Sequence, residues 1–287
     1  MKFGLIGHPI AHSQSPALFK AAYNGKYGYD LIEGAYFEES YRKFINGYKA
    51  INITAPFKDE AFEKAEVVSG PAALIGAANI LVKTDEGVAC YNSDFTGIII
   101  SVAEELFPGI TEEFYSEFGD RAHIKIHQFV KAKISELGSK AKALIVGCGG
   151  AGKAAALAAA EMGFETSIMN RSADKVEKFV KGLPEYGFRT LGIEAFKEAL
   201  KENDLVIYAL PKALDCIAGL EAEDFRKGQI ILEANYKDPS FTGTVADTMA
   251  KAQVRYIPGK LWLINQAISG YAVMTGETPD IKALMNR

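Results

Sequence analysis

The chain has 287 residues, 48% of them hydrophobic and 24% charged, a composition that fits a folded globular protein and excludes an intrinsically disordered one. Its 36 acidic and 32 basic residues give a net charge of −4, so we expect no nucleic-acid partner. The longest uncharged runs, such as 261–276, are shorter than a membrane span, and the N-terminal segment does not read as a signal peptide. We therefore expect no membrane partner.

The cysteine and histidine content bears on the compartment and on metal binding. The three cysteines are odd in number and widely spaced, so we expect a reduced, cytoplasmic environment. The histidine pairs at 8 and 12 and at 123 and 127 have no third ligand at suitable spacing, so we expect no metal site.

The first hundred residues alternate between short apolar runs and helical segments. A helix is expected over 15–23, with Ser15 as its N-cap and Pro16 in its first turn. This alternation predicts a largely parallel sheet. Strands are expected at 2–7, 51–54, 79–83 and 87–91.

The segment 107–142 differs from its surroundings, because it is charge-rich and has helical spacing over 127–137. We interpret it as an inserted linker region between two domains. A second α/β unit begins at Ala143. Strands are expected at 143–146, 166–169, 205–209 and 229–233, helices at 153–162 and 173–181, and an apolar helix at 261–274.

A glycine loop separates the strand at 143–146 from the helix that follows it. Residues 147–152 read Gly-Cys-Gly-Gly-Ala-Gly and satisfy the G-x-G-x-x-G pattern between a buried strand and a helix. Such a loop brings backbone N–H groups and a helix N-terminus to a pyrophosphate, whereas the plain alternative is a tight turn with no ligand. The residues expected to bind a dinucleotide are Gly147, Gly149, Gly150, Ala151 and Gly152.

About twenty residues after the loop, the sequence bears on the choice between NAD and NADP. An NAD site places a carboxylate there, but this chain has Asn170-Arg171-Ser172, with Lys175 one turn later. A guanidinium suits the 2′-phosphate of NADP, although Arg171 as a surface charge is the simpler alternative. The pattern favours NADP(H) as cofactor.

Polar residues in the first unit fall at strand ends and helix starts, where open α/β sheets bind ligands. Each has a structural alternative: Ser15 and Asp94 as helix caps, and Lys58 as a surface lysine. The clusters are Ser13-Gln14-Ser15, the run from Asn52 through Thr54 to Lys58, Asn79, and Asn92-Ser93-Asp94.

Several ordered motifs together resemble the shikimate/quinate dehydrogenase family over nearly the whole chain. The opening segment 4–16, the run Asn-Ile-Thr-Ala-Pro-Phe-Lys at 52–58, Gly-Ala-Ala-Asn at 76–79 and Asn-Ser-Asp-Phe-Thr-Gly at 92–97 are similar to the signatures of that family. The resemblance implies an N-terminal substrate domain, a Rossmann-like NADP-binding domain and a C-terminal helix that returns to the first domain. The implied bounds are 1–103 with 258–287 for the substrate domain and 104–257 for the NADP-binding domain.

The resemblance also implies an activity and a set of residue roles. The activity is the NADPH-dependent reversible reduction of 3-dehydroshikimate to shikimate, in chorismate and aromatic amino-acid biosynthesis. Lys58 and Asp94 would form the acid–base pair. Substrate contacts would come from Ser13, Ser15, Asn52, Thr54, Asn79, Tyr236 and Gln266, and cofactor contacts from the glycine loop, Asn170, Arg171, Ser172, Lys175 and Gly259.

Several positions depart from the family pattern, chiefly where nicotinamide contacts are expected. Ile80 replaces a threonine, and Trp262 replaces a methionine. Tyr208-Ala209-Leu210-Pro211 stands in place of Asn-Ala-Thr-Ser, and Glu233 and Asn235 change a D-x-x-Y arrangement that keeps Tyr236.

Two alternative functions and the assembly state stay open at this point. The first alternative is a quinate/shikimate dehydrogenase, or a paralogue that acts on a related cyclic hydroxy acid. The second alternative is a different class of protein, a non-catalytic NADP-binding sensor, although such a sensor has no need of Lys58 and Asp94. The sequence does not distinguish a monomer from a homodimer.

Overall fold

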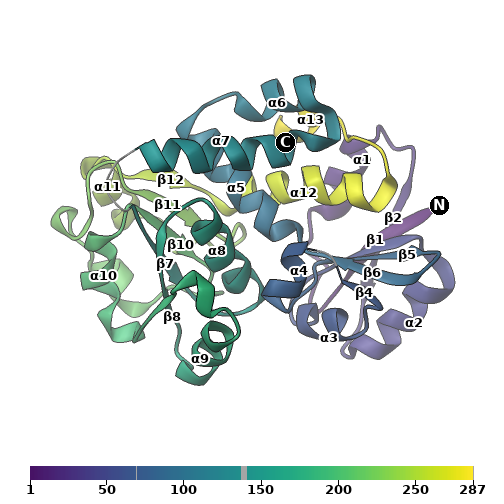
Figure 1. Cartoon of the computed structure of the whole chain (residues 1–287), viewed down its shortest axis with the longest axis horizontal. Coiled ribbons are helices and arrows are strands. Elements are labelled where there is room, and N and C mark those ends of the chain that lie inside the picture. The colour runs from purple at the N-terminus through teal and green to yellow at the C-terminus, as the bar shows by residue number, and fades with distance from the viewer. Residues whose placement is uncertain (69, 137–140, 287) are drawn as a thin grey trace. The chain divides into compact units, whose positions relative to one another are not determined.

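The computed structural model describes residues 1–68, 70–136 and 141–286, and Figure 1 traces the chain by residue number. The chain divides into two compact units. Unit 1 comprises Met1–Gly97, Glu112–Ala122 and Ile264–Arg287, and unit 2 comprises Ile98–Thr111 and His123–Leu263. Within the described residues, no helix combines the length and the apolar character needed to cross a membrane.

Unit 1 is built on a mixed sheet with strand order β2-β1-β3-β5-β6-β4. Its strands are β1 (Lys2–Gly7), β2 (Gly28–Glu33), β3 (Ala50–Ile53), β4 (Val67–Val68), β5 (Ile80–Thr84) and β6 (Gly87–Tyr91). Its helices are α1 (Ser15–Ala22), α2 (Phe37–Gly47), α3 (Lys58–Glu63), α4 (Gly70–Ile75) and α13 (Ile281–Met285), together with parts of α5 (Ser93–Leu106), α6 (Ile110–Phe118) and α12 (Gly259–Thr275).

The expectation of a largely parallel sheet holds for unit 1 except at β5, which alone among the six described strands of this sheet runs against the others. Strands β2, β1 and β3 are parallel, but β5 runs antiparallel to both β3 and β6. The cause is the connection between β5 and β6, because only Asp85 and Glu86 lie between them. So short a link can only reverse the chain and form an antiparallel hairpin.

The core of unit 1 forms where β1, β3, β5 and β6 pack against α2 and α3. Inner residues of β1 and β3 are almost fully buried, as expected for central strands of a sheet. Helix α2 contributes an amphipathic face to the same cluster. The buried members of this cluster include Ile6, Phe37, Phe44, Ile51, Ile53, Phe57 and Leu81.

Unit 2 is built on a fully parallel sheet with strand order β12-β11-β10-β7-β8-β9. Its strands are β7 (Lys142–Val146), β8 (Glu165–Met169), β9 (Arg189–Leu191), β10 (Leu205–Tyr208), β11 (Ile230–Glu233) and β12 (Arg255–Ile257). Its helices are α7 (Ala122–Glu136, from His123), α8 (Gly150–Glu161), α9 (Ala173–Lys181), α10 (Phe196–Glu202) and α11 (Thr244–Lys251), with the remaining parts of α5, α6 and α12.

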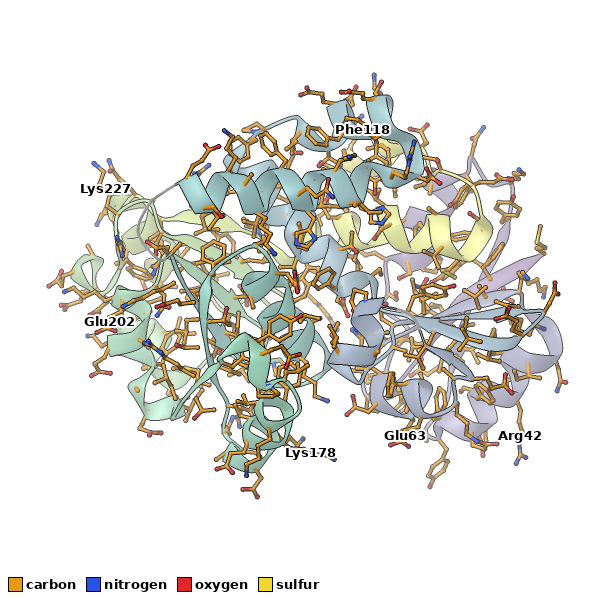
Figure 2. All side chains as sticks on the ribbon, in the orientation of Figure 1. Arg42, Glu63, Phe118, Lys178, Glu202 and Lys227 are labelled. Carbon is orange, nitrogen blue, oxygen red and sulfur yellow. The ribbon has the colours of Figure 1, made fainter. Side chains whose placement is uncertain are left out.

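Alanine-rich α8 packs on β7, β8 and β10. Small side chains let this helix approach the sheet closely, and nearly all of its residues after Lys153 are buried. Helix α9 is instead amphipathic: it buries Val176 and Phe179, and its lysines project outward, as Figure 2 shows for Lys178. A separate cluster of buried residues packs around β7, β10, β11 and α10. It includes Leu144, Val146, Phe196, Leu200, Tyr208, Ile231 and Phe241.

The region expected as a linker is mostly helical. Helices α6 and α7 span most of 110–136, and the last residue of the expected helical spacing, 137, lies outside the described residues. The His127 ring nitrogen Nε2 lies 3.1 Å from the carbonyl oxygen of Glu161, at the end of α8. Helix α7 therefore packs against α8 within unit 2.

The observed boundaries differ from the expected domain bounds. The chain leaves unit 1 inside α5, at Gly97, and returns to it inside α12, at Ile264. Residues 112–122, expected within the inserted region, group with unit 1. The C-terminal helix thus rejoins the first unit.

Candidate active site

Two charged side chains of unit 1 form a close pair. Lys58 is the first residue of α3 and Asp94 is the second residue of α5. The Lys58 Nζ and Asp94 Oδ2 atoms are 2.5 Å apart, and the two side chains are only 16% and 5% exposed. Lys58 is therefore not a solvated surface lysine, and Asp94 does not act as the N-cap of α5.

Local backbone contacts fix this pair in place. The N–H of Ala78 donates to the Lys58 carbonyl at 2.9 Å, which ties the start of α3 to the segment before β5. At the start of α5, the Asn92 side-chain oxygen accepts from the Phe95 N–H at 3.4 Å. Asn92 thus performs the capping function, and the carboxylate of Asp94 is directed to the lysine instead.

A buried amide network lies beside the charged pair. The side-chain oxygen of Asn79 accepts from the Ser93 N–H at 2.8 Å. Its nitrogen Nδ2 donates to the Ser93 hydroxyl at 3.0 Å and to the Gln266 side-chain oxygen at 3.1 Å. Asn79 therefore joins the residue before Asp94 to α12, and the structure brings Asn79 and Gln266 together as predicted for one site.

Glycines make the approach of α12 to α5 possible. A Cβ atom at Gly97 would lie 2.7 Å from the N, Cα and Cβ atoms of Gln266. A Cβ at Gly270 would lie 2.9 Å from the Ser93 hydroxyl. Both distances are too short for a real side chain, so the glycines are required for Gln266 to reach Asn79.

The two serines near the N-terminus lie at the start of α1 and contact each other. The Ser13 hydroxyl donates to the Ser15 hydroxyl at 3.2 Å, and the Ser15 N–H donates to the Ser13 oxygen at 3.2 Å. The predicted N-cap role of Ser15 is wrong, because Gln14 occupies the cap position and Ser15 is the first helical residue. Ser15 therefore lies inside the first turn, where it is half-buried.

Asn52 and Thr54 lie close together at the end of β3 and are both half-buried. The side-chain oxygen of Asn52 accepts from the Tyr29 hydroxyl at 2.8 Å. Thr54 lies one residue beyond the strand, where its N–H donates to the Ile6 carbonyl at 2.9 Å. The tyrosine partner of Asn52 is not evident from the sequence, because nothing distinguishes Tyr29 from the other tyrosines of the chain.

In unit 2, the glycine loop has the geometry that a dinucleotide requires. Gly147 has φ +112°, a left-handed conformation, and its N–H donates to the Met169 carbonyl at 2.8 Å. A Cβ at Gly152 would lie 2.1 Å from the Gly147 oxygen, so α8 can approach the loop only without a side chain there. Gly149 caps α8 and has open space at its Cβ position. These residues fit a pyrophosphate at the helix N-terminus.

The residues expected near the 2′-phosphate follow β8. Asn170 donates through Nδ2 to the Ser172 carbonyl at 3.2 Å, and Ser172 is the cap residue of α9. Arg171 and Lys175 are both exposed, and the Lys175 carbonyl lies 3.9 Å from Cys148 Sγ in the glycine loop. The loop and the basic residues therefore lie at the same edge of the sheet.

Two of the departures from the family pattern form buried polar contacts at the ends of β10 and β11. The Tyr208 hydroxyl donates to the Lys212 carbonyl at 2.8 Å and accepts from the Leu214 N–H at 3.0 Å. Glu233 is fully buried; its carboxylate accepts from the Ser240 N–H at 2.6 Å and from the Tyr256 hydroxyl at 2.7 Å. These contacts hold the two loops that follow the strands.

Asn235 links the same two loops. Its side-chain nitrogen donates to the Pro211 carbonyl at 3.2 Å, and its oxygen accepts from the Asp238 N–H at 3.1 Å. Tyr236 lies in this loop, and a Cβ at Gly259 would lie 2.7 Å from the Ala234 carbonyl oxygen. Gly259 thus permits α12 to begin directly against the loop that carries Tyr236.

The predicted site residues fall into two groups. Ser13, Ser15, Asn52, Thr54, Lys58, Asn79, Asp94 and Gln266 belong to unit 1, and the expected cofactor residues and Tyr236 belong to unit 2. In the parts of the chain that the structure describes, no three His, Cys, Asp or Glu side chains cluster as metal ligands would.

Two family models match segments of this chain, one mainly in each unit. The model for the shikimate dehydrogenase substrate binding domain matches residues 5–81, and the model for shikimate / quinate 5-dehydrogenase matches residues 129–227. The shikimate dehydrogenase (NADP(+)) of Archaeoglobus fulgidus is 30% identical over 97% of this chain and 94% of its own length. A pentafunctional AROM polypeptide of Candida tropicalis is 28% identical over 96% of this chain, which spans only 17% of that polypeptide.

Solved structures share the fold. The structure of shikimate 5-dehydrogenase from Thermus thermophilus, in complex with NADP(H) and shikimate, superposes with a TM-score of 0.74 at 22% identity, covering 100% of this chain and 97% of that one. With family models on both units and a full-length relative at 30% identity, the chain belongs to the shikimate dehydrogenase family.

Proposed function

We propose that this protein is a shikimate dehydrogenase, which catalyses the reversible NADP(H)-dependent reduction of 3-dehydroshikimate to shikimate in chorismate and aromatic amino-acid biosynthesis. It is thus an oxidoreductase acting on a CH–OH group. The buried Lys58–Asp94 pair, in a chain of this family, is the observation that carries the proposal. The relative from Archaeoglobus fulgidus is named for the same activity.

Lys58 acts on the oxygen of the reacting carbonyl. Its ammonium has three N–H donors, and the contact with Asp94 engages one of them, which leaves donors for a substrate oxygen. The positive charge stabilises the negative charge that develops on this oxygen as it becomes an alcohol. Asp94 holds the ammonium in position and balances its charge.

The neutral polar residues among the predicted site residues hold the substrate in this proposal. We assign the carboxylate and its neighbouring hydroxyl to Ser13, Ser15 and Thr54. The ring hydroxyls are assigned to Asn52, Asn79, Gln266 and Tyr236. A polyhydroxylated acid requires such donors and acceptors, because each buried polar group left unpaired costs about 1–3 kcal/mol.

Bound NADPH supplies the hydride in this proposal. The N-terminus of α8 and the loop residues Gly147, Gly149, Gly150, Ala151 and Gly152 would bind its pyrophosphate. Arg171 and Lys175, with Asn170 and Ser172, would bind the adenosine 2′-phosphate, and Gly259 borders the loop expected at the nicotinamide. The exposed positions of Arg171 and Lys175 at the edge of the glycine loop support this assignment.

The relatives reported above favour shikimate over quinate, and the enzyme over a non-catalytic sensor. The pairing of Lys58 with Asp94 agrees with this preference, because a sensor needs no acid–base pair. We place the reaction in the cytoplasm on the basis of the cysteine content.

An assay of the purified protein with shikimate or quinate, each offered with NADP⁺ or NAD⁺, tests the proposal. We expect reduction of NADP⁺ with shikimate to have the highest kcat/KM of the four combinations. A higher kcat/KM with quinate or with NAD⁺ would reassign the protein within its family, and inactivity with both acids would contradict the proposal.

A further inference from the structure

Two tyrosine hydroxyls outside the predicted site lie against the residues assigned to the substrate. Tyr29 on β2 donates to the Asn52 side-chain oxygen at 2.8 Å. Tyr271 on α12 donates to the Ser15 carbonyl at 3.3 Å, and its side chain is 2% exposed. The two rings are neighbours, with centroids 6.5 Å apart.

The position of Tyr29 in the sheet explains why a tyrosine is needed there. Strand β1 lies between β2 and β3, so Tyr29 and Asn52 are on strands separated by about 9–10 Å. Tyr29 pairs with Phe3 on β1, and Asn52 pairs with Leu5 two residues further along. The tyrosine ring spans the width of the intervening strand, and its hydroxyl is the group that reaches the amide.

Aromatic packing fixes the Tyr29 ring. The Phe19 ring lies with its centroid 4.7 Å from that of Tyr29 and 4.8 Å from that of Tyr271. Phe19 is itself fully buried on α1. This packing therefore holds the Tyr29 hydroxyl in one position.

The contact determines which group of Asn52 is left for a ligand. A side-chain amide offers one oxygen acceptor and two N–H donors. Because the Asn52 oxygen accepts from Tyr29, the amide nitrogen is the part available to a hydroxyl or carboxylate oxygen. A reversed amide would place an N–H against the tyrosine and present an acceptor to the substrate hydroxyl instead, so the tyrosine decides the direction of that hydrogen bond.

The Tyr29 hydroxyl keeps its proton near neutral pH, and so remains a hydrogen-bond donor. Burial of the hydroxyl raises the pKa of Tyr29 well above its ordinary value; the nearby Tyr271 acts in the same direction, and a hydrogen bond with Ser15 opposes it. Burial also raises the pKa of Tyr271. Neither hydroxyl ionises near neutral pH.

We propose that Tyr29 is a positioning residue for the substrate: by donating to Asn52 it orients the Asn52 amide nitrogen as a hydrogen-bond donor to an oxygen of the polyhydroxylated acid. This inference rests on the proposed function and goes beyond it, because it assigns a role to a residue outside the predicted site and a direction to the Asn52 hydrogen bond.

Tyr29→Phe removes the hydroxyl and keeps the ring. Tyr27→Phe is the matched control, because Tyr27 belongs to the same aromatic cluster but its hydroxyl donates to the exposed carboxylate of Glu277. We expect Tyr29→Phe to raise the KM for shikimate about five- to tenfold. The KM for NADP⁺ and the melting temperature should match those of the control.

A second measurement reads the amide directly. In ¹⁵N-labelled protein, the Asn52 side-chain NH₂ signals are identified by their loss in Asn52→Ala, and shikimate is titrated into the wild type and into Tyr29→Phe. We expect these signals to shift on binding in the wild type, and to shift less and broaden in Tyr29→Phe.

These outcomes separate the inference from the proposed function. Equal KM values for shikimate in Tyr29→Phe and Tyr27→Phe, in an active enzyme, would overturn the role of Tyr29 and leave the function intact. An Asn52 amide that does not respond to shikimate would also overturn it. Failure of the wild type to reduce NADP⁺ with shikimate would instead count against the proposed function.

Discussion

Gly97 on α5 and Gln266 on α12 approach each other so closely that a Cβ at Gly97 would lie 2.7 Å from the Gln266 backbone. This approach places the Gln266 side chain at Asn79, which in turn holds the N–H of Ser93 next to Asp94. The missing side chain at Gly97 therefore determines the position of Gln266, a proposed substrate-binding residue, near the Lys58–Asp94 pair.

Gly97→Ala should cost about 1–3 kcal/mol of the free energy of unfolding, because the added methyl group overpacks the contact between the two helices. The KM for shikimate should rise as Gln266 moves away from Asn79. Gly47→Ala is the matched control, because a Cβ at that helical position meets nothing within 4 Å. Urea unfolding and steady-state kinetics measure both effects; equal stability of the two variants would contradict the contact.

Asp94→Asn should lower kcat about 100-fold while leaving the affinity for NADPH unchanged. The neutral amide cannot balance the Lys58 ammonium 2.5 Å away, so the lysine loses its fixed position. Asp85→Asn, in the exposed turn between β5 and β6, is the control and should keep the wild-type kcat. A kcat for Asp94→Asn within about twofold of the control would remove Asp94 from the acid–base pair.

Arg171→Asp should raise the KM for NADP⁺ about 10- to 100-fold and change the KM for NAD⁺ little, because only NADP⁺ carries the 2′-phosphate. Lys178→Asp changes the charge equally on the outer side of α9, where Figure 2 shows its side chain, and should affect both cofactors little. Steady-state kinetics give the KM values for NADP⁺ and NAD⁺ in both variants. If both KM values rose by the same factor in Arg171→Asp, the residue would have no part in choosing NADP⁺.

The protein should lose stability as the pH rises above 10. Burial raises the pKa of Tyr208 from 10.0 to about 12, so between these values the unfolded chain loses the proton and the folded chain keeps it. Stability is complete below pH 10 and falls as the pH approaches 12, by about 2–3 kcal/mol for this group.

Urea unfolding at about pH 9 and about pH 11.5, on either side of the onset of tyrosine ionisation, measures this fall. Tyr208→Phe should show a smaller fall than the wild type, while Tyr36→Phe, at a residue that is 70% exposed, should keep the wild-type fall. The quantity to compare is the change in the free energy of unfolding between the two pH values. The free energy itself also differs in Tyr208→Phe, because this variant loses the contacts with the loop at 212–214. The same change in all three proteins would contradict the prediction.

Four of the six described strands in each sheet were predicted from the sequence. Strand β6 and helix α9 have the predicted bounds, because a hairpin turn and clear amphipathic spacing mark their ends. Strand β2 and helix α2 were not predicted: β2 lies in a tyrosine-rich segment with few aliphatic residues, and α2 begins without a side-chain cap. Only packing against β1 and the core of unit 1 identifies them.

The candidate site was predicted from residue types at strand ends and from the family resemblance, and the parts not predicted are long-range contacts. The Lys58–Asp94 pair joins residues 36 positions apart, and the Asn79–Gln266 contact joins residues 187 positions apart. The cap role given to Ser15 was wrong because Gln14 adopts the cap position without a side-chain hydrogen bond. Tyr29 was not predicted because its role depends on the strand order β2-β1-β3, which local spacing does not contain.

The most direct test of the account is the turnover of Lys58→Ala measured together with its affinity for NADPH. Lys64→Ala, at the exposed end of α3, is the control. We expect Lys58→Ala to lose shikimate-dependent NADP⁺ reduction by at least about 100-fold while it binds NADPH as the wild type does. Full turnover in Lys58→Ala would contradict the central role of the Lys58–Asp94 pair.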